Sequence, residues 1–223
     1  MKELTRDVYV LLYPLRLLGA DFRRMVTVIR LGTGELVIHS TGPFTPHDVA
    51  AIMELGKPGW LLEVMLRHDT FSKQGRQAFP NVPFLAPPGF SEVVGFSTTP
   101  LIPAPAAWGN ELQVLRLEGI PSMQEHVVFH EPSHTLIVAD MLFNFGPETS
   151  VWTRSLLRCA VGPKYNPGMS RPFRMAVKDK PAFQRSVRNL MNWNFDRIVV
   201  GHGEVIETEG KAQLANALKE AGF

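Results

Sequence analysis

The sequence predicts an α+β protein in which two β-sheets pack face to face and helices cover their outer surfaces. Three observations lead to this fold class. The first half of the chain is rich in strand-like segments, the second half alternates strands with helical segments, and 45% of the 223 residues are hydrophobic. This length and composition suffice for one sizeable core, so we expect a single domain over residues 1–223.

Apolar and β-branched runs mark the first strands. RDVYVLLY at 6–13 predicts a strand, and RMVTVIRL at 24–31, followed by GTG and ELVIHS at 35–40, predicts a hairpin with a glycine-bearing loop. GWLLEVMLRH at 59–68 is apolar along most of its length, which is typical of a strand inside a sheet. VPFLAP at 82–87 predicts one more strand.

One helix in this half carries clear end signals. In TPHDVAAIMELGK, Thr45 is the expected N-cap, Pro46 the first helical residue, and Gly56 lies beyond the last turn. A short helical stretch is expected at 75–79. The proline-rich stretch 86–109 has no clear period, so we expect a long surface loop with at most one embedded turn.

The second half predicts strands and helices by the same criteria. Periodicity of two or continuous apolar runs indicate strands, whereas Phe183, Val187 and Leu190 recur at helical spacing. The expected strands are 111–120, 125–130, 135–144 and 197–202, and the expected helices are 148–160, 181–193 and 210–222.

The formal net charge of +2 is unevenly distributed along the chain. Residues 151–200 hold ten Lys or Arg and two acids, so the segment carries +8 and the rest of the chain −6. Such a segment is either a solvated helical surface or a contact for a partner that carries phosphate or carboxylate.

Other features of the sequence restrict the class of protein. Cys159 is the single cysteine, which excludes an internal disulfide framework and fits a reducing compartment. Glu3, Asp7 and Arg16 interrupt what would otherwise resemble a signal peptide, and we expect a cytoplasmic protein. No segment approaches the roughly 20 apolar residues that span a bilayer, and we expect no membrane partner.

Three strand ends deliver groups that bind metal ions. LLEVMLRHD ends at His68 and Asp69, TLIVAD ends at Asp140, and RIVVGHG ends at His202 between two glycines. Imidazole and carboxylate together suit zinc, iron or manganese, whereas calcium or magnesium favour oxygen ligands alone.

A hairpin places further groups near Asp140. If EPSH at 131–134 is the turn between two antiparallel strands, His130 lies opposite Thr135 and Glu125 lies opposite Asp140. His126 is then level with Asp140, and a shift of one residue in register decides whether it faces the aspartate. His126 is therefore a weaker candidate ligand.

The quoted segments resemble a known family. HTLIVADMLFNF resembles the segment of metallo-β-lactamase-fold proteins that ends at a metal-bridging aspartate, and RIVVGHGEVI resembles their final strand and last histidine ligand. The match extends from about residue 24 to 202 and is closest to an uncharacterised bacterial branch of that superfamily. It implies a four-layer αββα sandwich with the site at one edge of the two sheets. It also implies that Gly201 and Gly203 let the backbone bring His202 into a crowded site.

The sequence also departs from the family pattern. The family's HxHxDH motif corresponds to HDTFSK at 68–73, so only His68 is retained, and Thr70, Ser72 and Lys73 replace the other ligands. The family's middle histidine falls near GIPS at 119–122, where Ile120 or Ser122 stands. The resemblance therefore implies one metal ion held by His68, Asp140 and His202, with Asp69 or His126 as a fourth ligand, or an empty site.

Two functions remain open at this point. The first is a mononuclear metal-dependent hydrolase with one zinc, iron or manganese ion, in which Asp140 and His202 are catalytic. Its substrate is expected to be a small anionic phosphodiester, ester or lactone, bound by Lys164, Arg171 and Arg174. A single-stranded nucleic acid is a weaker candidate ligand for the same bases. The second is a catalytically silent protein of the same fold that binds a ligand or partner without a metal ion.

Overall fold

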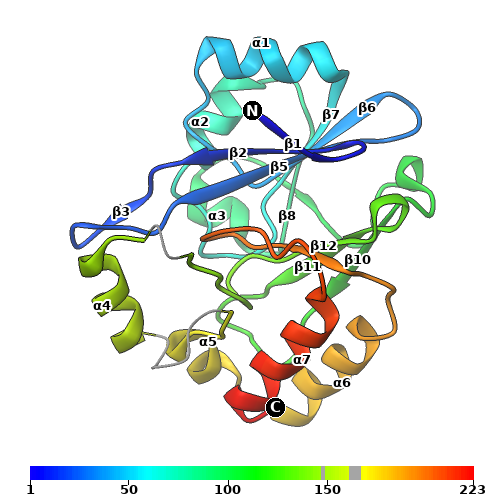
Figure 1. Ribbon diagram of the computed structural model, residues 1–223. Helices are drawn as coiled ribbons and strands as arrows, with labels where there is room; N and C mark the ends of the chain where they lie inside the picture. Colours follow the sequence, from blue (N-terminus) through cyan, green and yellow to red (C-terminus); the bar gives the residue numbers. More distant parts are fainter. Residues whose placement is uncertain (147–148, 161–166) are drawn as a thin grey trace.

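The protein consists of two β-sheets that pack face to face, with helices outside both (Figure 1). The computed structural model describes residues 1–146, 149–160 and 167–223. Within this part, the first sheet has the order β1-β2-β5-β6-β7-β8-β9 and the second the order β10-β11-β12-β13. Every strand of the first sheet precedes every strand of the second along the chain.

The strands and helices have the following bounds. The first sheet contains β1 (Lys2–Thr5), β2 (Val8–Tyr13), β5 (Arg24–Arg30), β6 (Glu35–His39), β7 (Lys57–Leu62), β8 (Phe84–Ala86) and β9 (Thr99–Pro100). The second contains β10 (Leu112–Arg116), β11 (His126–His130), β12 (Thr135–Ile137) and β13 (Arg197–Val199), and a separate hairpin pairs β3 (Arg16–Leu17) with β4 (Ala20–Asp21). The helices are α1 (Pro46–Leu55), α2 (Ser72–Ala78), α3 (Phe90–Val94), α4 (Val151–Ala160), α5 (Arg171–Ala176), α6 (Lys180–Leu190) and α7 (Gly210–Ala221), with 3-10 turns at Ala106–Trp108 and Glu131–Ser133.

Two apolar clusters hold these layers together. The larger lies between the sheets and continues under α5, α6 and α7, and the smaller lies between the first sheet and α1, α2 and α3. Successive residues of one strand belong to different clusters. In β5, Ile29 faces the other sheet, whereas Val28 faces the helices. Each fully buried Ile, Leu or Val contributes about 1.5–3 kcal/mol, so this division accounts for the four-layer arrangement.

Most of the predicted elements are present. The hairpin of β5 and β6 is antiparallel with Val28 opposite Ile38, and α1 begins at Pro46 with a capping box in which Thr45 accepts from the Asp48 backbone. β7 has neighbours on both sides, as the apolar run predicted. The pairing of β11 with β12 sets His130 opposite Thr135, which confirms the predicted register.

Other boundaries differ from the prediction. β7 ends at Leu62 instead of near 68, and the next residue, Glu63, pairs with Arg24 in the core. The stretch 86–109 contains α3 and β9, and α5 was not predicted since six residues are too few to show a helical period. No helix in the described ranges is long and apolar enough to cross a bilayer.

Candidate metal centre

His68, Asp140 and His202 meet at one edge of the two sheets. The Nε2 atom of His68 lies 3.0 Å from Oδ1 of Asp140, and Nε2 of His202 lies 3.3 Å from the same oxygen. All three ligand atoms are within 4.8 Å of one another. The two histidines are buried, whereas the Asp140 side chain retains 20% exposure. Asp140 is therefore the member of the group that faces solvent.

The strand pairing explains how Asp140 and His202 come together. β12 and β13 are parallel, and Ile137 is in register with Val199. Both residues of the site follow their paired strand residue by three positions, and the carboxyl ends of parallel strands lie at the same sheet edge. The two side chains thus leave the core side by side, although 62 positions separate them in the sequence.

A buried ion pair holds the segment that carries His68. The Nη2 atom of Arg24 donates to both carboxylate oxygens of Glu63 and to the backbone oxygen of His68, each at 3.0 Å. Glu63 also accepts from the backbone N–H and hydroxyl of Thr41. Arg24 and Glu63 are almost fully buried, so this charged network fixes the backbone at His68 within the core.

The neighbouring residue Arg23 orients the other histidine. Nδ1 of His202 donates to the Arg23 backbone oxygen at 2.6 Å, which fixes the ring with Nε2 facing Asp140. Phe143 stacks on the His202 ring with an interplanar angle of 11°. The start of β5 therefore anchors both histidines, one through the Arg24 side chain and one through a carbonyl.

The glycines around His202 are required by close packing. A Cβ atom at Gly203 would lie 2.0 Å from the Asn144 carbonyl oxygen, and the φ angle of +108° disfavours any other residue. A Cβ atom at Gly201 would lie 2.8 Å from the Ala139 oxygen and 3.1 Å from Cε1 of His68. The two glycines thus allow the 201–203 loop to pack against the residues that carry the other ligands.

Glu125 supports the loop that carries Asp140. Its carboxylate accepts hydrogen bonds from the backbone N–H groups of Ala139, Asp140 and Met141 at 2.9 to 3.2 Å. Glu125 is therefore level with Asp140, as the register predicted. Its carboxylate contacts the backbone of the Asp140 loop. Burial, with the nearby Asp140 charge, raises the pKa of Glu125 to about 8.

The protonation states of the group suit metal binding near neutral pH. Burial raises the pKa of Asp140, but the interactions with His68 and His202 lower it by more. The resulting pKa of Asp140 is well below its usual value. Burial and the charge of Arg24 lower the pKa of His68 to about 4. An ionised carboxylate beside a neutral imidazole is the state in which these groups coordinate a metal ion.

The spacing of the ligand atoms also fits a metal ion. Zinc–nitrogen and zinc–oxygen bonds of about 2.0–2.1 Å place the ligand atoms of a tetrahedral centre about 3.3 Å apart. The two nitrogen–oxygen contacts of 3.0 and 3.3 Å are close to that separation, and the two histidine nitrogens lie within 4.8 Å of each other. The group could therefore hold a metal ion.

Comparison with solved structures places this arrangement in a known fold. A metallo-β-lactamase from Erythrobacter litoralis, with β-mercaptoethanol in its active site, superposes with a TM-score of 0.68 and 15% sequence identity over 98% of this chain and 95% of that chain. The chain has the metallo-β-lactamase fold. A metallo-β-lactamase from Pontibacter korlensis gives a TM-score of 0.65 and 11% identity over 98% and 97% of the two chains. No protein-family model and no curated protein sequence matches the chain.

Residues that replace the HxHxDH ligands of the metallo-β-lactamase fold do not extend the group. Within the described ranges, the metal-binding group consists of His68, Asp140 and His202. Thr70 and Lys73 are exposed, and Ser72 is buried at the start of α2. Asp69 is exposed and outside the group, and the ring of His126 donates from Nδ1 to the Gln124 backbone oxygen at 2.8 Å. The structure thus brings together three of the five predicted ligands.

The predicted substrate-binding bases lie elsewhere. Arg171 and Arg174 line a pocket of about 430 Å³ beside the C-terminal end of α7, and no ligand of the metal centre lines that pocket. Lys164 lies outside the described residues.

Several residues of the site could not be found from sequence patterns. Arg24 and Glu63 are each charged residues within strand-like runs, and only their burial reveals the ion pair. His39 is buried, and neither of its ring nitrogens has a hydrogen-bond partner in the described structure. Phe143 lay in the segment that resembled the family, but nothing in its spacing indicated contact with His202.

Proposed function

We propose that this protein is a mononuclear metal-dependent hydrolase. The observation that carries the proposal is the convergence of two imidazole nitrogens on one carboxylate oxygen, at 3.0 and 3.3 Å. Three protein ligands and one open position are the usual composition of a catalytic zinc site. The structural likeness to metallo-β-lactamases is consistent with this proposal, since hydrolysis is among the activities that the fold supports.

The residues around the group have distinct roles in this proposal. A bound divalent ion would supply Lewis acidity and lower the pKa of a coordinated water to about 7. Asp140, which is partly exposed and ionised, would orient an incoming water by accepting a hydrogen bond from it. Arg23 and Arg24 would hold His202 and His68 in place while the substrate binds.

The proposed substrate class is an ester, lactone or phosphodiester, as expected from the sequence. A bound ion would polarise the carbonyl or phosphoryl oxygen that these substrates share. Phe143 and Phe145 stack on one another beside His202 and are buried, so they hold the ring of His202 in place. Arg171 and Arg174 of the basic segment line a separate pocket and are therefore not assigned to substrate binding.

A metal-free binding protein is the second candidate, and a separate observation favours it. The 3.0 Å contact between His68 and Asp140 is also a normal hydrogen-bond length, and a proton on His202 would satisfy the second contact. Protons could therefore hold the same three side chains together without a metal ion.

Metal analysis distinguishes the two candidates. Protein purified without chelators and without a histidine tag should contain about one equivalent of zinc, iron or manganese by inductively coupled plasma mass spectrometry. The His202→Ala and Asp140→Ala variants should lose that metal, whereas His134→Ala should retain it. His134 is a suitable control because its ring bonds to the Asn194 backbone oxygen, away from the group.

The outcomes separate clearly. Loss of metal in both site variants, together with metal-dependent cleavage of an ester, lactone or phosphodiester in a substrate panel, would support the hydrolase. Wild-type protein that stays metal-free after incubation with each of the three ions would refute it and leave the binding protein.

A further inference from the structure

Four apolar side chains form an exposed surface on the hairpin of β3 and β4 and the first turn of α4. Leu17 and Leu18 are 60% and 77% exposed, and Val151 and Trp152 are 72% and 57% exposed. We call these four residues the hairpin–α4 patch. Single exposed apolar residues are ordinary, but a cluster of large ones on one surface indicates an interaction site.

Hydrogen bonds fix the two halves of the patch to each other. The indole N–H of Trp152 donates to the Leu18 backbone oxygen at 3.1 Å, and the backbone N–H of Asp21 donates to the Thr153 hydroxyl at 3.3 Å. Thr153 is buried, so α4 is anchored through this residue while Trp152 points outward. The hairpin and α4, which lie more than 130 positions apart in the sequence, are therefore joined by hydrogen bonds. The apolar side chains of both face solvent.

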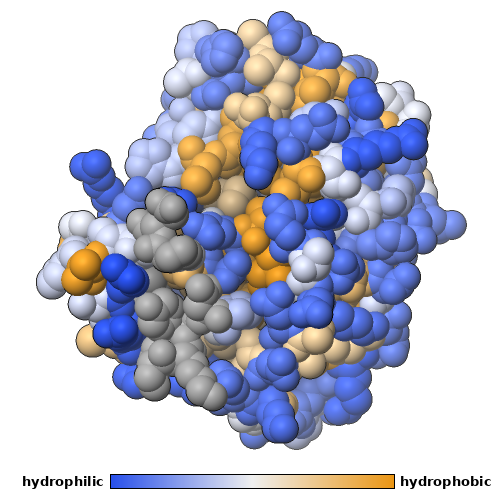
Figure 2. Space-filling view, in the orientation of Figure 1, coloured by the Kyte–Doolittle hydropathy of each residue, from blue (hydrophilic) through white to orange (hydrophobic). Residues whose placement is uncertain are grey.

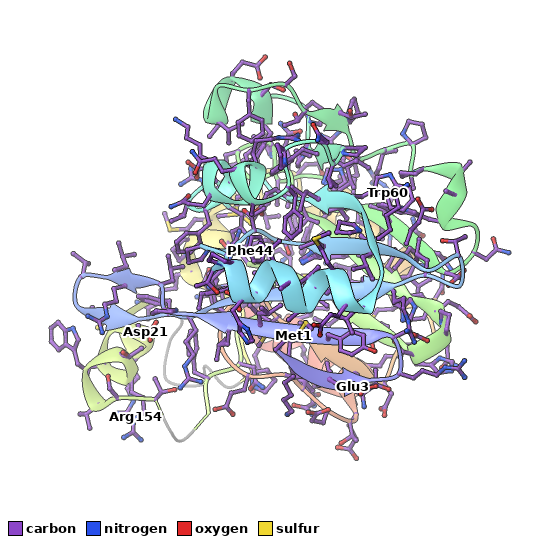
Figure 3. All side chains as sticks on the ribbon, turned by 90° about the horizontal axis from the view of Figure 1, so that it is seen from above. Met1, Glu3, Asp21, Phe44, Trp60 and Arg154 are labelled. Carbon is purple, nitrogen blue, oxygen red and sulfur yellow. The ribbon has the colours of Figure 1, made fainter. Side chains whose placement is uncertain are left out.

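The patch protrudes from the body of the protein. Figures 1 and 3 show the β3–β4 hairpin and α4 extending together beyond the two sheets, and Figure 2 shows an apolar residue at that margin among hydrophilic ones. A projecting hairpin tip with two adjacent leucines is unusual, because loop tips are normally polar. Its convex shape suits insertion into a soft surface better than docking of a second folded protein, which needs an extended complementary area.

Arginines surround the patch. Arg16 is exposed beside Leu17, Arg158 is exposed on α4, and Arg154 is partly exposed one turn after Val151. Asp21, the acid at the base of the hairpin, already accepts hydrogen bonds from the backbone N–H groups of Leu15 and Arg23. The charge around the apolar side chains is therefore positive.

We propose that the hairpin–α4 patch binds the surface of an anionic lipid membrane. Trp and Leu side chains partition into the boundary between head groups and acyl chains, and nearby arginines attract lipid phosphates. This contact requires no membrane-spanning segment. It differs from the sequence-based expectation of no membrane partner, which rested on the lack of such a segment.

A series of aromatic contacts connects the hairpin to the candidate metal centre. Phe22 follows the hairpin directly and packs edge-on against Phe145, which stacks on Phe143, and Phe143 stacks on His202. Membrane binding does not depend on the proposed hydrolase activity, so the two can be tested separately.

Vesicle flotation of the full chain tests the proposal. The wild-type protein should float with vesicles that contain phosphatidylglycerol and bind pure phosphatidylcholine vesicles at least about tenfold more weakly, since several arginines contribute. The double variant Leu17→Ser, Leu18→Ser should lose at least about tenfold in affinity for the anionic vesicles, because it removes two apolar side chains that would enter the membrane. Met53→Ser is the matched control, since Met53 is 60% exposed on α1.

Tryptophan fluorescence gives a second measurement that does not depend on folding of the leucine variants. Trp108 is buried, Trp60 and Trp193 are partly buried, and Trp152 is the exposed member of the four. Anionic vesicles should shift the wild-type emission to shorter wavelength, and Trp152→Phe should remove the shift while binding persists.

Three results would overturn the proposal. The first is no flotation with either vesicle type, and the second is flotation that the leucine double variant leaves unchanged although it folds like wild type. The third is a dimer by light scattering that the same variant converts to monomer while no vesicle binds, which would assign the patch to a second copy of the chain.

Discussion

Replacement of Arg24 by methionine tests whether the buried ion pair organises the site. Arg24 and Glu63 have side-chain exposures of 2% and 0%. The substitution removes the guanidinium from both Glu63 oxygens and leaves a buried carboxylate with only the hydrogen bonds from Thr41. Loss of one partner of a buried pair costs about 3–5 kcal/mol. The His68 backbone oxygen also loses its donor, which adds about 1 kcal/mol.

This cost is a large share of the 5–15 kcal/mol by which domains are usually stable. Urea unfolding in the presence of a chelator measures it without a contribution from bound metal. The double variant Arg24→Met, Glu63→Met should lose less stability than either single variant, because no uncompensated charge remains in the core.

Arg30→Met is the matched control for this experiment. Arg30 pairs with Asp7 at 2.7 Å, but their side chains are 42% and 23% exposed, so its loss should cost less than about 1 kcal/mol. If Arg24→Met costs no more than Arg30→Met, the buried pair does not organise the core.

Three further predictions concern other parts of the chain. Burial, with the nearby charges of His68 and Arg24, lowers the pKa of His39 to about 3 from about 6.5, so its contribution to stability is complete above pH 6.5 and lost as the pH falls toward 3. Below pH 6.5, His39→Gln should reduce the slope of the unfolding free energy against pH by up to about 1.4 kcal/mol per unit, and an unchanged slope in urea titrations would contradict this. Gly203→Ala should destabilise by about 3 kcal/mol or more in chemical denaturation, whereas Gly34→Ala, with φ +81° and open space at Cβ, should lose only about 1 kcal/mol; equal losses would argue against the close approach to Asn144. Thr45→Ala removes the cap of α1 and should cost about 1 kcal/mol, with Thr45→Ser close to wild type in the same assay.

The sequence predicted those features of the fold that depend on neighbouring residues. The cap at Thr45, the β5–β6 hairpin and the pairing of His130 with Thr135 all follow from local periodicity and turn chemistry. The positions of Asp140 and His202 near a sheet edge were also visible, because each apolar run stops close to the polar residue; both lie three residues beyond the end of their strand. His68 lies six residues beyond the end of β7, which is farther than the sequence predicted. Their convergence was expected from the family resemblance, and the parallel register of β12 and β13 accounts for part of it.

Features that depend on contacts across the fold could not be predicted. Arg24 and Glu63 lie 39 positions apart, and only the folded structure shows that each neutralises the other in the core. The same holds for the Arg23 carbonyl, since a backbone atom carries no side-chain signal. Asp69 follows His68 directly, yet the chain turns there and leaves the carboxylate in solvent.

The strict sequential order of the two sheets has a practical consequence. Residues 2–100 supply all strands of the first sheet and residues 112–199 all strands of the second, so one cut near 102–110 would divide the chain into two fragments. His68 would belong to one fragment, and Asp140 and His202 to the other. Each fragment alone would therefore carry an incomplete set of the three side chains. If the group binds a metal ion as proposed, the ion would join the two fragments in addition to the apolar cluster between the sheets, and their association would be tighter with the metal than without it.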